Sequence, residues 1–203
     1  RRQPLESEAS SLEDERARLE AGVDASPPPP YTRNPDLRST CTGAPLWQLV
    51  DFRESVTQPE RAGLEAALEV SGLLDAWVTA DGLLQTSDGE TVFNDTQLLV
   101  RRPQRNPLAD WLAVSMPSDS AVTAAVVERV LSSIACSLDD PSEAEAWVSP
   151  DGRFRLGTLA GAWAKPVAAY IGHAARAAAR ARRLAEIADG LELLTRQLAD
   201  VHG

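Results

Sequence analysis

The chain has 203 residues and a net charge of −10, with 43% hydrophobic but only 5% aromatic residues. This length predicts one domain with appendages, and the acidic total excludes a protein that coats nucleic acid over its whole surface, although it leaves room for a local basic stripe. The longest apolar runs, such as residues 121–127, are too short to span a bilayer, and no secretory signal opens the chain.

Cysteine usage and the first residue bear on the setting in which the protein works. The two cysteines, Cys41 and Cys136, lie in unrelated contexts, which favours a cytoplasmic protein with two reduced thiols over a disulfide framework. The chain begins at Arg1 rather than methionine, so we expect it to be part of a longer protein.

Residues 1–24 predict an incoming helical arm. Its seam residues recur at alternating steps of four and three, at Leu5, Ala9, Leu12, Arg16, Leu19 and Val23. Gly22 and the prolines at 27–30 end this helix, because proline lacks the amide donor. Residues 25–45, rich in proline, serine and threonine, predict an extended connector.

Residues 46–171 predict a mixed α+β domain. Its first part begins with residues 45–52, which predict a short apolar strand or the edge of one. A helix follows that Pro59 opens and Gly72 ends, with Leu64 and Leu68 on its buried face. A strand follows at residues 73–79. Weaker strand candidates lie at residues 91–93 and 98–101, and a short helical piece at 108–112. A further helix follows, capped by Ser118 or Asp119, with a buried face of Val122, Val126, Val130 and Ile134.

Two tryptophan-led segments of this domain have similar sequences. Residues 75–82 read DAWVTADG and residues 145–152 read EAWVSPDG, each a strand that closes on an Asp-Gly turn. The likeness predicts either two related half-domains or a chance reuse of a common turn signal. The alternation in residues 153–156 predicts a return strand, and beyond Gly157 and Gly161 we expect the chain to be helical to its end.

Residues 172–203 predict an outgoing helical arm. After Pro166 a second unbroken heptad seam runs through Leu184, Ile187, Leu191, Leu194, Leu198 and Val201, with Gly190 as a soft spot. Neither terminal helix can bury its seam alone, so the sequence predicts an antiparallel coiled-coil hairpin that carries the mixed domain.

Residue patterns that carry catalytic or metal chemistry are missing from the sequence. There is no phosphate-binding loop, no His-Glu-x-x-His and no Cys-x-x-Cys, and His173 and His202 lack partners at ligand spacing. We therefore predict no catalytic, cofactor-binding or metal-binding residue, and no cofactor.

A basic stripe marks the start of the outgoing arm and makes four arginines the candidate DNA contacts: Arg176, Arg180, Arg182 and Arg183. Two other interpretations are open, namely an ordinary solvated face and arginines paired with acidic residues of the neighbouring arm. Arg101, Arg102 and Arg105 form a second, weaker cluster.

This arrangement of arm, domain and arm resembles the hinge of structural-maintenance-of-chromosomes (SMC) ATPases. The segment from VSPDGRF at residues 148–154 to GTLAG at 157–161 is similar to the end of an SMC hinge, where a strand turn precedes a glycine-rich segment. The residues PLWQLVDF (45–52), LEAALEVSGLLDAWV (64–78) and YIG (170–172) resemble more closely the large SMC-like ATPase of actinobacterial Wadjet anti-plasmid systems. One departure is Ala162, where ordinary hinges often carry a second glycine.

The resemblance covers most of residues 45–187 and implies a hinge that forms a homodimer and joins two ATPase protomers. It further implies accessory subunits, DNA as the substrate of the whole machine, a cytoplasmic and nucleoid-associated location, and ATPase heads outside this segment. By position it places Gly157 and Gly161 near the dimer interface.

Two functions of other classes stay open from the residues alone. One is a stand-alone acidic α+β enzyme whose residue 184–201 seam packs on the mixed domain. The other is a monomeric adaptor whose exposed seam binds a helix of another protein.

Overall fold

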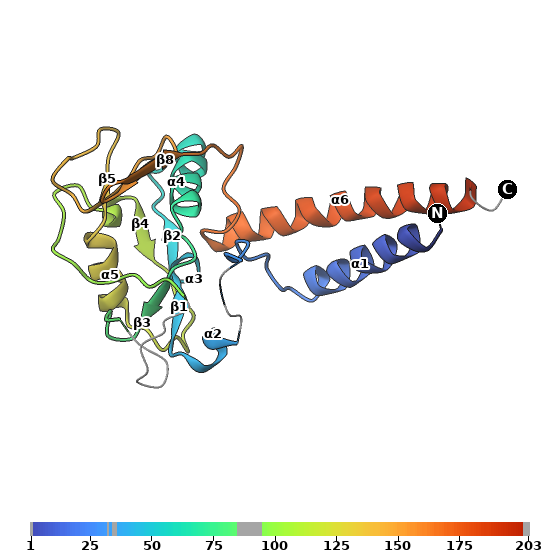
Figure 1. Ribbon diagram of the computed structural model, residues 1–203, viewed down its shortest axis with the longest axis horizontal. Helices are drawn as coiled ribbons and strands as arrows, with labels where there is room; N and C mark the ends of the chain where they lie inside the picture. Colours follow the sequence, from blue (N-terminus) through green and yellow to red (C-terminus); the bar gives the residue numbers. More distant parts are fainter. Residues whose placement is uncertain (1, 32, 34–35, 85–94, 201–203) are drawn as a thin grey trace. The chain divides into compact units, whose positions relative to one another are not determined.

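The computed structural model describes residues 2–31, 33, 36–84 and 95–200, and the chain divides into two compact units. One unit combines Arg1–Ser26 with His173–Gly203, and the other is Pro27–Gly172. The chain is a mixed α+β protein, as predicted. Because both terminal segments belong to one unit, the mixed unit is an insertion between two helices (Figure 1).

The helical unit consists of α1 (Arg2–Glu20) and α6 (His173–Asp200). The two helices run in opposite directions, since Asp24 contacts Arg176 at the start of α6 whereas Glu15 contacts Arg183 further along. Buried positions on both helices fall on the predicted seams: Leu19, Ile187 and Leu194. The last predicted seam residue, Val201, lies outside the described residues.

The described residues of the mixed unit form three small sheets. Two are antiparallel pairs, β1 with β3 and β2 with β4, and the third has four strands in the order β5-β6-β7-β8. In that sheet β5 and β6 are parallel and the other neighbours antiparallel. The strands are β1 (Gly43–Pro45), β2 (Val50–Phe52), β3 (Trp77–Thr79), β4 (Leu112–Val114), β5 (Ala135–Cys136), β6 (Ala146–Val148), β7 (Arg153–Leu156) and β8 (Leu159–Ala162).

The helices of the mixed unit follow local signals in part. In α4 (Gln58–Val70) Thr57 and Glu60 form a capping box, and Gly72 follows the helix with a positive φ of 80°. In α5 (Ala124–Ser132) the cap is Thr123, whose side chain accepts a hydrogen bond from the Val126 amide. The predicted cap at Ser118 or Asp119 was therefore wrong, because the chain makes an irregular turn before the helix starts.

Other predictions for the mixed unit agree with the structure only in part. Within residues 45–52 the apolar run is not one strand, because α3 (Leu46–Leu49) separates β1 from β2. The chain beyond Gly161 is not helical at once: β8 ends at Ala162, and α6 starts only at His173. The short helical piece predicted at 108–112 is confirmed as the 3-10 helix η2 (Leu108–Asp110). The predicted extended connector contains a short helix, α2 (Leu37–Thr40). The strand candidate at residues 91–93 lies outside the described residues, and 98–101 forms no strand.

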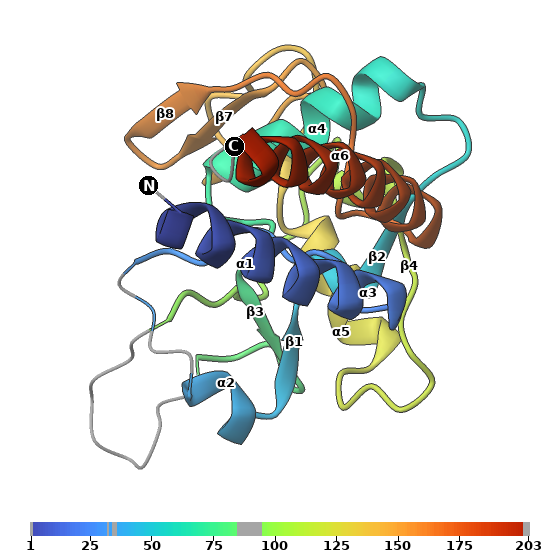
Figure 2. The ribbon, with the colours of Figure 1, turned by 90° about the vertical axis from the view of Figure 1, so that its right-hand side faces the viewer.

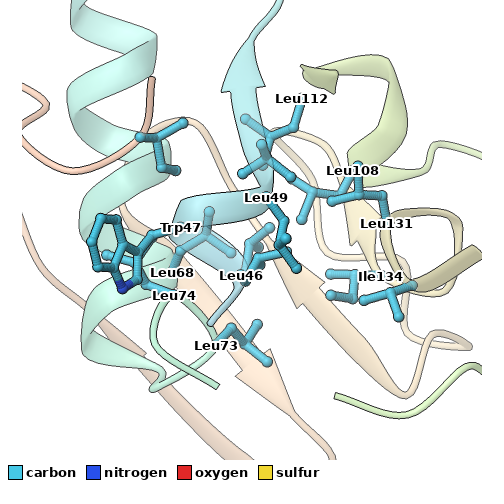
Figure 3. Close-up of a cluster of buried hydrophobic side chains, with 14 of the residues drawn as sticks. Leu46, Trp47, Leu49, Leu68, Leu73, Leu74, Leu108, Leu112, Leu131 and Ile134 are labelled. Carbon is cyan, nitrogen blue, oxygen red and sulfur yellow. The ribbon is translucent and has the colours of Figure 1, made fainter. Parts of the chain in front are cut away.

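The core of the mixed unit joins these elements through aliphatic side chains. Leucines from α3, α4, η2 and β4 meet in one cluster with residues of α5 (Figure 3). Its fully buried members include Leu46, Leu49, Leu68, Leu74, Leu108 and Leu112. The core therefore ties α4 and α5 to the strands, and it fixes the sheets on which the candidate site is built.

The two tryptophan-led segments form β3 and β6 and end in the same local turn. The Gly82 amide donates to the Thr79 carbonyl at 3.2 Å, and the Gly152 amide donates to the Ser149 carbonyl at 3.1 Å. Their strand neighbours differ, because β3 pairs antiparallel with β1 whereas β6 lies between parallel β5 and antiparallel β7. The turn chemistry accounts for the local likeness, and a duplication of the whole half-domain stays a prediction.

Two helical glycines predict opposite effects of substitution. A Cβ atom at Gly63 in α4 would lie 2.0 Å from the carbonyl oxygen of Pro150, whereas one at Gly190 in α6 would meet only Leu12 Cδ1 at 3.4 Å. We expect Gly63→Ala to destabilise the mixed unit by about 1–3 kcal/mol or more, because backbone must move. Gly190→Ala should stabilise the helical unit by about 0.5–1 kcal/mol. Urea unfolding followed by circular dichroism measures both, and equal signs would contradict this packing.

Candidate functional site

The β7–β8 hairpin holds both glycines that the sequence placed near an interface. Leu156 pairs with Leu159, so Gly157 is the first residue of a two-residue turn, and its φ of 57° suits glycine. Gly161 lies opposite Phe154, where an added Cβ would come within 2.8 Å of the Phe154 ring atom Cε1. The local structure therefore explains why glycine occupies each of these positions, without any contact to a partner.

Strand β8 is the open edge of the four-stranded sheet (Figure 2). The opposite edge is covered, because the Cys136 amide donates to the Asn106 carbonyl at 2.8 Å and Pro107 bridges Ala135. All four residues of β8 are exposed, and no pairing partner for its outer edge occurs in the described part of the chain. Exposed edge strands of this kind are natural templates for pairing with another strand.

The surroundings of β8 are apolar and uncharged. Residues 156–164, with the sequence LGTLAGAWA, contain no charged side chain. Leu159 is 61% exposed and Trp163 is 45% exposed. Edge strands are usually protected by lysine, proline or inward-pointing charges, and β8 has none of these.

The arginine stripe on α6 contacts acidic residues of the helical unit. Asp24 accepts hydrogen bonds from Arg176 at 3.1 Å and from Arg180 at 2.6 Å. Arg183 donates to both oxygens of Glu15, at 2.8 and 2.9 Å, and hydrogen bonding to this guanidinium holds the pKa of the Glu15 carboxyl below its ordinary value.

Arg182 is the exception in this stripe. Its side chain is exposed, and within the described residues it has no charged partner. The other three arginines pair with acidic residues of the neighbouring arm, which is one of the interpretations that the sequence allowed. Contact of the stripe with DNA stays a prediction. In the weaker cluster, Arg101 lies 4.0 Å from Glu145 and Arg102 donates to the Glu143 carbonyl.

Sequence reasoning missed a buried carboxylate in α4. Glu65 has an exposure of 0%, and its carboxylate accepts three backbone amides, from Ala169 at 2.6 Å, Tyr170 at 3.0 Å and Ile171 at 2.8 Å. It also accepts from Lys165 Nζ at 2.6 Å. A single side chain therefore binds Lys165 and the amides of residues 169–171 in the segment that precedes α6.

Lys165, the only lysine in the sequence, completes this network. Its ammonium group also donates to Glu69 at 2.7 Å and lies 4.5 Å from the centre of the Tyr170 ring. Burial lowers the pKa of Lys165, but the carboxylates of Glu65 and Glu69 outweigh burial and raise it above its ordinary value. The available sequence signal was weak: one lysine in an arginine-rich chain, and two glutamates four residues apart on an otherwise buried helix.

A second ion-pair cluster holds the segment that enters the mixed unit. Arg33 and Arg38 both contact Asp75 and Asp95, and these side chains are between 6% and 17% exposed. The Arg38 guanidinium also lies 4.8 Å from the centre of the Trp77 ring. Burial raises the pKa of Asp95, but its bonds to Arg38 outweigh burial and lower it overall. The predicted connector is thus fastened to the domain.

Two surface pockets lie among the described residues of the mixed unit. One pocket between α4 and the β6–β7 turn is lined by Pro59, Gly63 and Pro150 and by the charged residues Glu60, Asp151 and Lys165. A second pocket is bordered by acidic side chains and Cys136. Burial raises the pKa of the Cys136 thiol, which suppresses the reactive thiolate. No group of histidine, cysteine and acidic side chains able to hold a metal ion occurs in the part of the chain that the structure describes.

Comparison with known proteins gives no match: no family model, no curated protein and no solved structure is significantly similar to this chain. None of the described helices combines the length and apolar character that a membrane-spanning segment requires.

The buried network predicts unequal effects for the two glutamates of α4. Glu65→Gln removes the charge opposite Lys165 and turns an amide NH₂ group toward backbone donors, so we expect a loss of about 3–5 kcal/mol in unfolding free energy. Glu69→Gln is the matched control and should cost about 1 kcal/mol, because it removes one charge at a less buried site and keeps an oxygen that can accept from Lys165. Chemical denaturation measures both, and equal losses would show that Glu65 does not fasten the segment before α6.

Proposed function

We propose that this chain is the hinge-like dimerisation module of an SMC-like ATPase, closest in kind to the large subunit of Wadjet anti-plasmid systems. In this proposal it joins two protomers and has no catalytic activity of its own. The observation that carries the proposal is topological. A compact α+β unit is inserted between two helices that pair with each other, so the chain enters and leaves the inserted unit through one helical arm.

The packing of the two helices supports the proposal over the alternatives. The stand-alone enzyme requires the seam of α6 to pack on the mixed domain, and the adaptor requires the same seam to be exposed. Ile187 and Leu194 are buried, and α6 groups with α1 rather than with the mixed unit. This pairing of seams is what two ends of a longer antiparallel coiled coil need.

The exposed edge strand supports the dimerisation part of the proposal. A joint between two protomers needs a surface that can pair, and β8 offers unpaired backbone groups beside two exposed apolar side chains, Leu159 and Trp163. Gly157 and Gly161, which the resemblance to SMC hinges assigns to the dimer interface, lie in and beside this strand.

Charged residues placed in the helix seam test whether dimerisation depends on the pairing of α1 with α6. We expect Ile187→Asp with Leu194→Asp to separate α1 from α6 at a cost of at least about 3 kcal/mol, because two charges would be buried, while the chain remains a dimer. The matched control is Leu193→Asp on the exposed face of α6, where the side chain is 54% exposed. Circular dichroism measures helix content and light scattering measures mass. Unfolding of the mixed unit by the double substitution would favour the enzyme instead.

Contact with DNA is the second part of the proposal and has its own test. Charge reversal at Arg176, Arg180 or Arg183 would also break the pairing of α1 and α6, so the informative variant is Arg182→Glu. If the stripe binds DNA, this variant should weaken binding and reduce the slope of log K against log salt by about 1. Fluorescence anisotropy with a labelled duplex at low salt measures both quantities. No binding by the unmodified chain would remove the stripe from the proposal.

A further inference from the structure

The hydrogen-bonding direction of every residue in β8 follows from the hairpin register. The Trp163 amide donates to the Gly152 carbonyl at 3.0 Å, so the backbone hydrogen-bonding groups of residue 163 point toward the β7 side of the sheet. Directions alternate along a strand, so Gly161 and Leu159 also bond inward to β7. The amide and carbonyl groups of Ala160 and Ala162 therefore point away from the sheet.

The outward-pointing backbone groups of Ala160 and Ala162 can both form hydrogen bonds when β8 pairs with β8 of a second copy in one particular register. Antiparallel pairing about a two-fold axis at Gly161 places Ala160 opposite the partner's Ala162, and each such pair exchanges two hydrogen bonds. The axis itself falls on a non-hydrogen-bonded pair of glycines, where opposing Cα atoms are only about 4.5 Å apart. A residue without a side chain suits that position.

The same register matches the exposed apolar side chains. With the axis at Gly161, Leu159 lies opposite the partner's Trp163, and the pair occurs twice by symmetry. Moving the axis to Ala160 would place Leu159 opposite the partner's Gly161, and moving it to Ala162 would place Leu159 opposite the partner's Lys165. Of these three registers, only the one centred on Gly161 brings the exposed side chains of Leu159 and Trp163 together.

Charge favours a second copy as the occupant of this edge. Two copies of a chain with a net charge of −10 repel each other, so self-association is favoured where the facing surface carries no charge. Residues 156–164 form such a strip, and Lys165 beside it is neutralised by Glu65 and Glu69. A partner of opposite charge would find no charged group on this strip to recognise.

We propose that two copies of this chain pair through β8 in antiparallel register about Gly161, so that their four-stranded sheets become one continuous sheet. The inference rests on the proposed dimerisation function and adds the interface and its register. The residues that determine the contact are Ala160 and Ala162 through their backbone, and Leu159 and Trp163 through their side chains.

Proline at an outward-facing position tests the interface without removing a bond inside the sheet. Ala160→Pro deletes an amide that points away from β7, and edge strands tolerate proline there. We expect it to weaken dimerisation at least about tenfold, because symmetry removes two hydrogen bonds at once. Ala160→Val is the matched control, since it keeps the amide and favours the strand. Sedimentation over a concentration series measures the affinity.

Amide hydrogen exchange on the same samples shows where the dimer forms. In the wild-type dimer the amides of Ala160 and Ala162 should be protected in a concentration-dependent manner. Those of Leu159 and Gly161 should be protected in dimer and monomer alike, which also shows that the proline variant is folded.

The possible results distinguish failure of the proposed β8 interface from failure of the proposed dimerisation function. A dimer that Ala160→Pro leaves unchanged overturns the β8 interface and leaves homodimerisation standing. A wild-type chain that is monomeric at about 1 mM overturns both proposals. Protection of Ala160 and Ala162 at every concentration without dimerisation would mean that another part of the same chain covers the edge, and it would also overturn the interface.

Discussion

The buried carboxylate of Glu65 is the constraint on which the end of the mixed unit depends. Ten residues lie between the end of β8 and the start of α6, and they form neither helix nor strand. Without secondary structure their amides need other acceptors, and Glu65 supplies three of these bonds from the interior of α4. A charge at zero exposure is stable only with such donors and a cation, and Lys165 is that cation. The helix and the segment therefore stabilise each other.

Local signals were sufficient for the elements that begin and end with a specific residue. Pro59 and Gly72 bound α4 as predicted, and the Asp-Gly turn with alternating residues at 153–156 gave the β6–β7 hairpin. Both terminal helices could be expected, because their apolar residues recur at steps of three and four over several turns, but the predicted seam residue Val23 lies beyond α1 and is 56% exposed. These features are encoded within a few residues of where they act.

The failures share the opposite property. Leu46 and Leu49 are both fully buried, so no alternation of polar and apolar residues distinguishes one helical turn from a strand. Pro166 is a reasonable first residue for a helix, but the amides that would follow it bind a carboxylate about a hundred positions earlier in the chain. The same limit applies to the arginine stripe. Helical spacing shows that these arginines share a face, but not that Asp24 and Glu15 lie opposite them.

The two segments by which the chain enters and leaves the mixed unit are both held by ion pairs, and this has a mechanical consequence. The incoming segment is fastened at Arg33 and Arg38 by two aspartates, and the outgoing segment at Lys165 and residues 169–171 by Glu65. Tension along α1 and α6 would thus be carried first by two clusters of short-range ion pairs, and only then by the aliphatic core. Charge-assisted hydrogen bonds of this kind hold their donor and acceptor atoms about 2.7–2.9 Å apart and require a directed geometry. Each of the two clusters is therefore the place where a pull on the neighbouring helix would first act on the inserted unit.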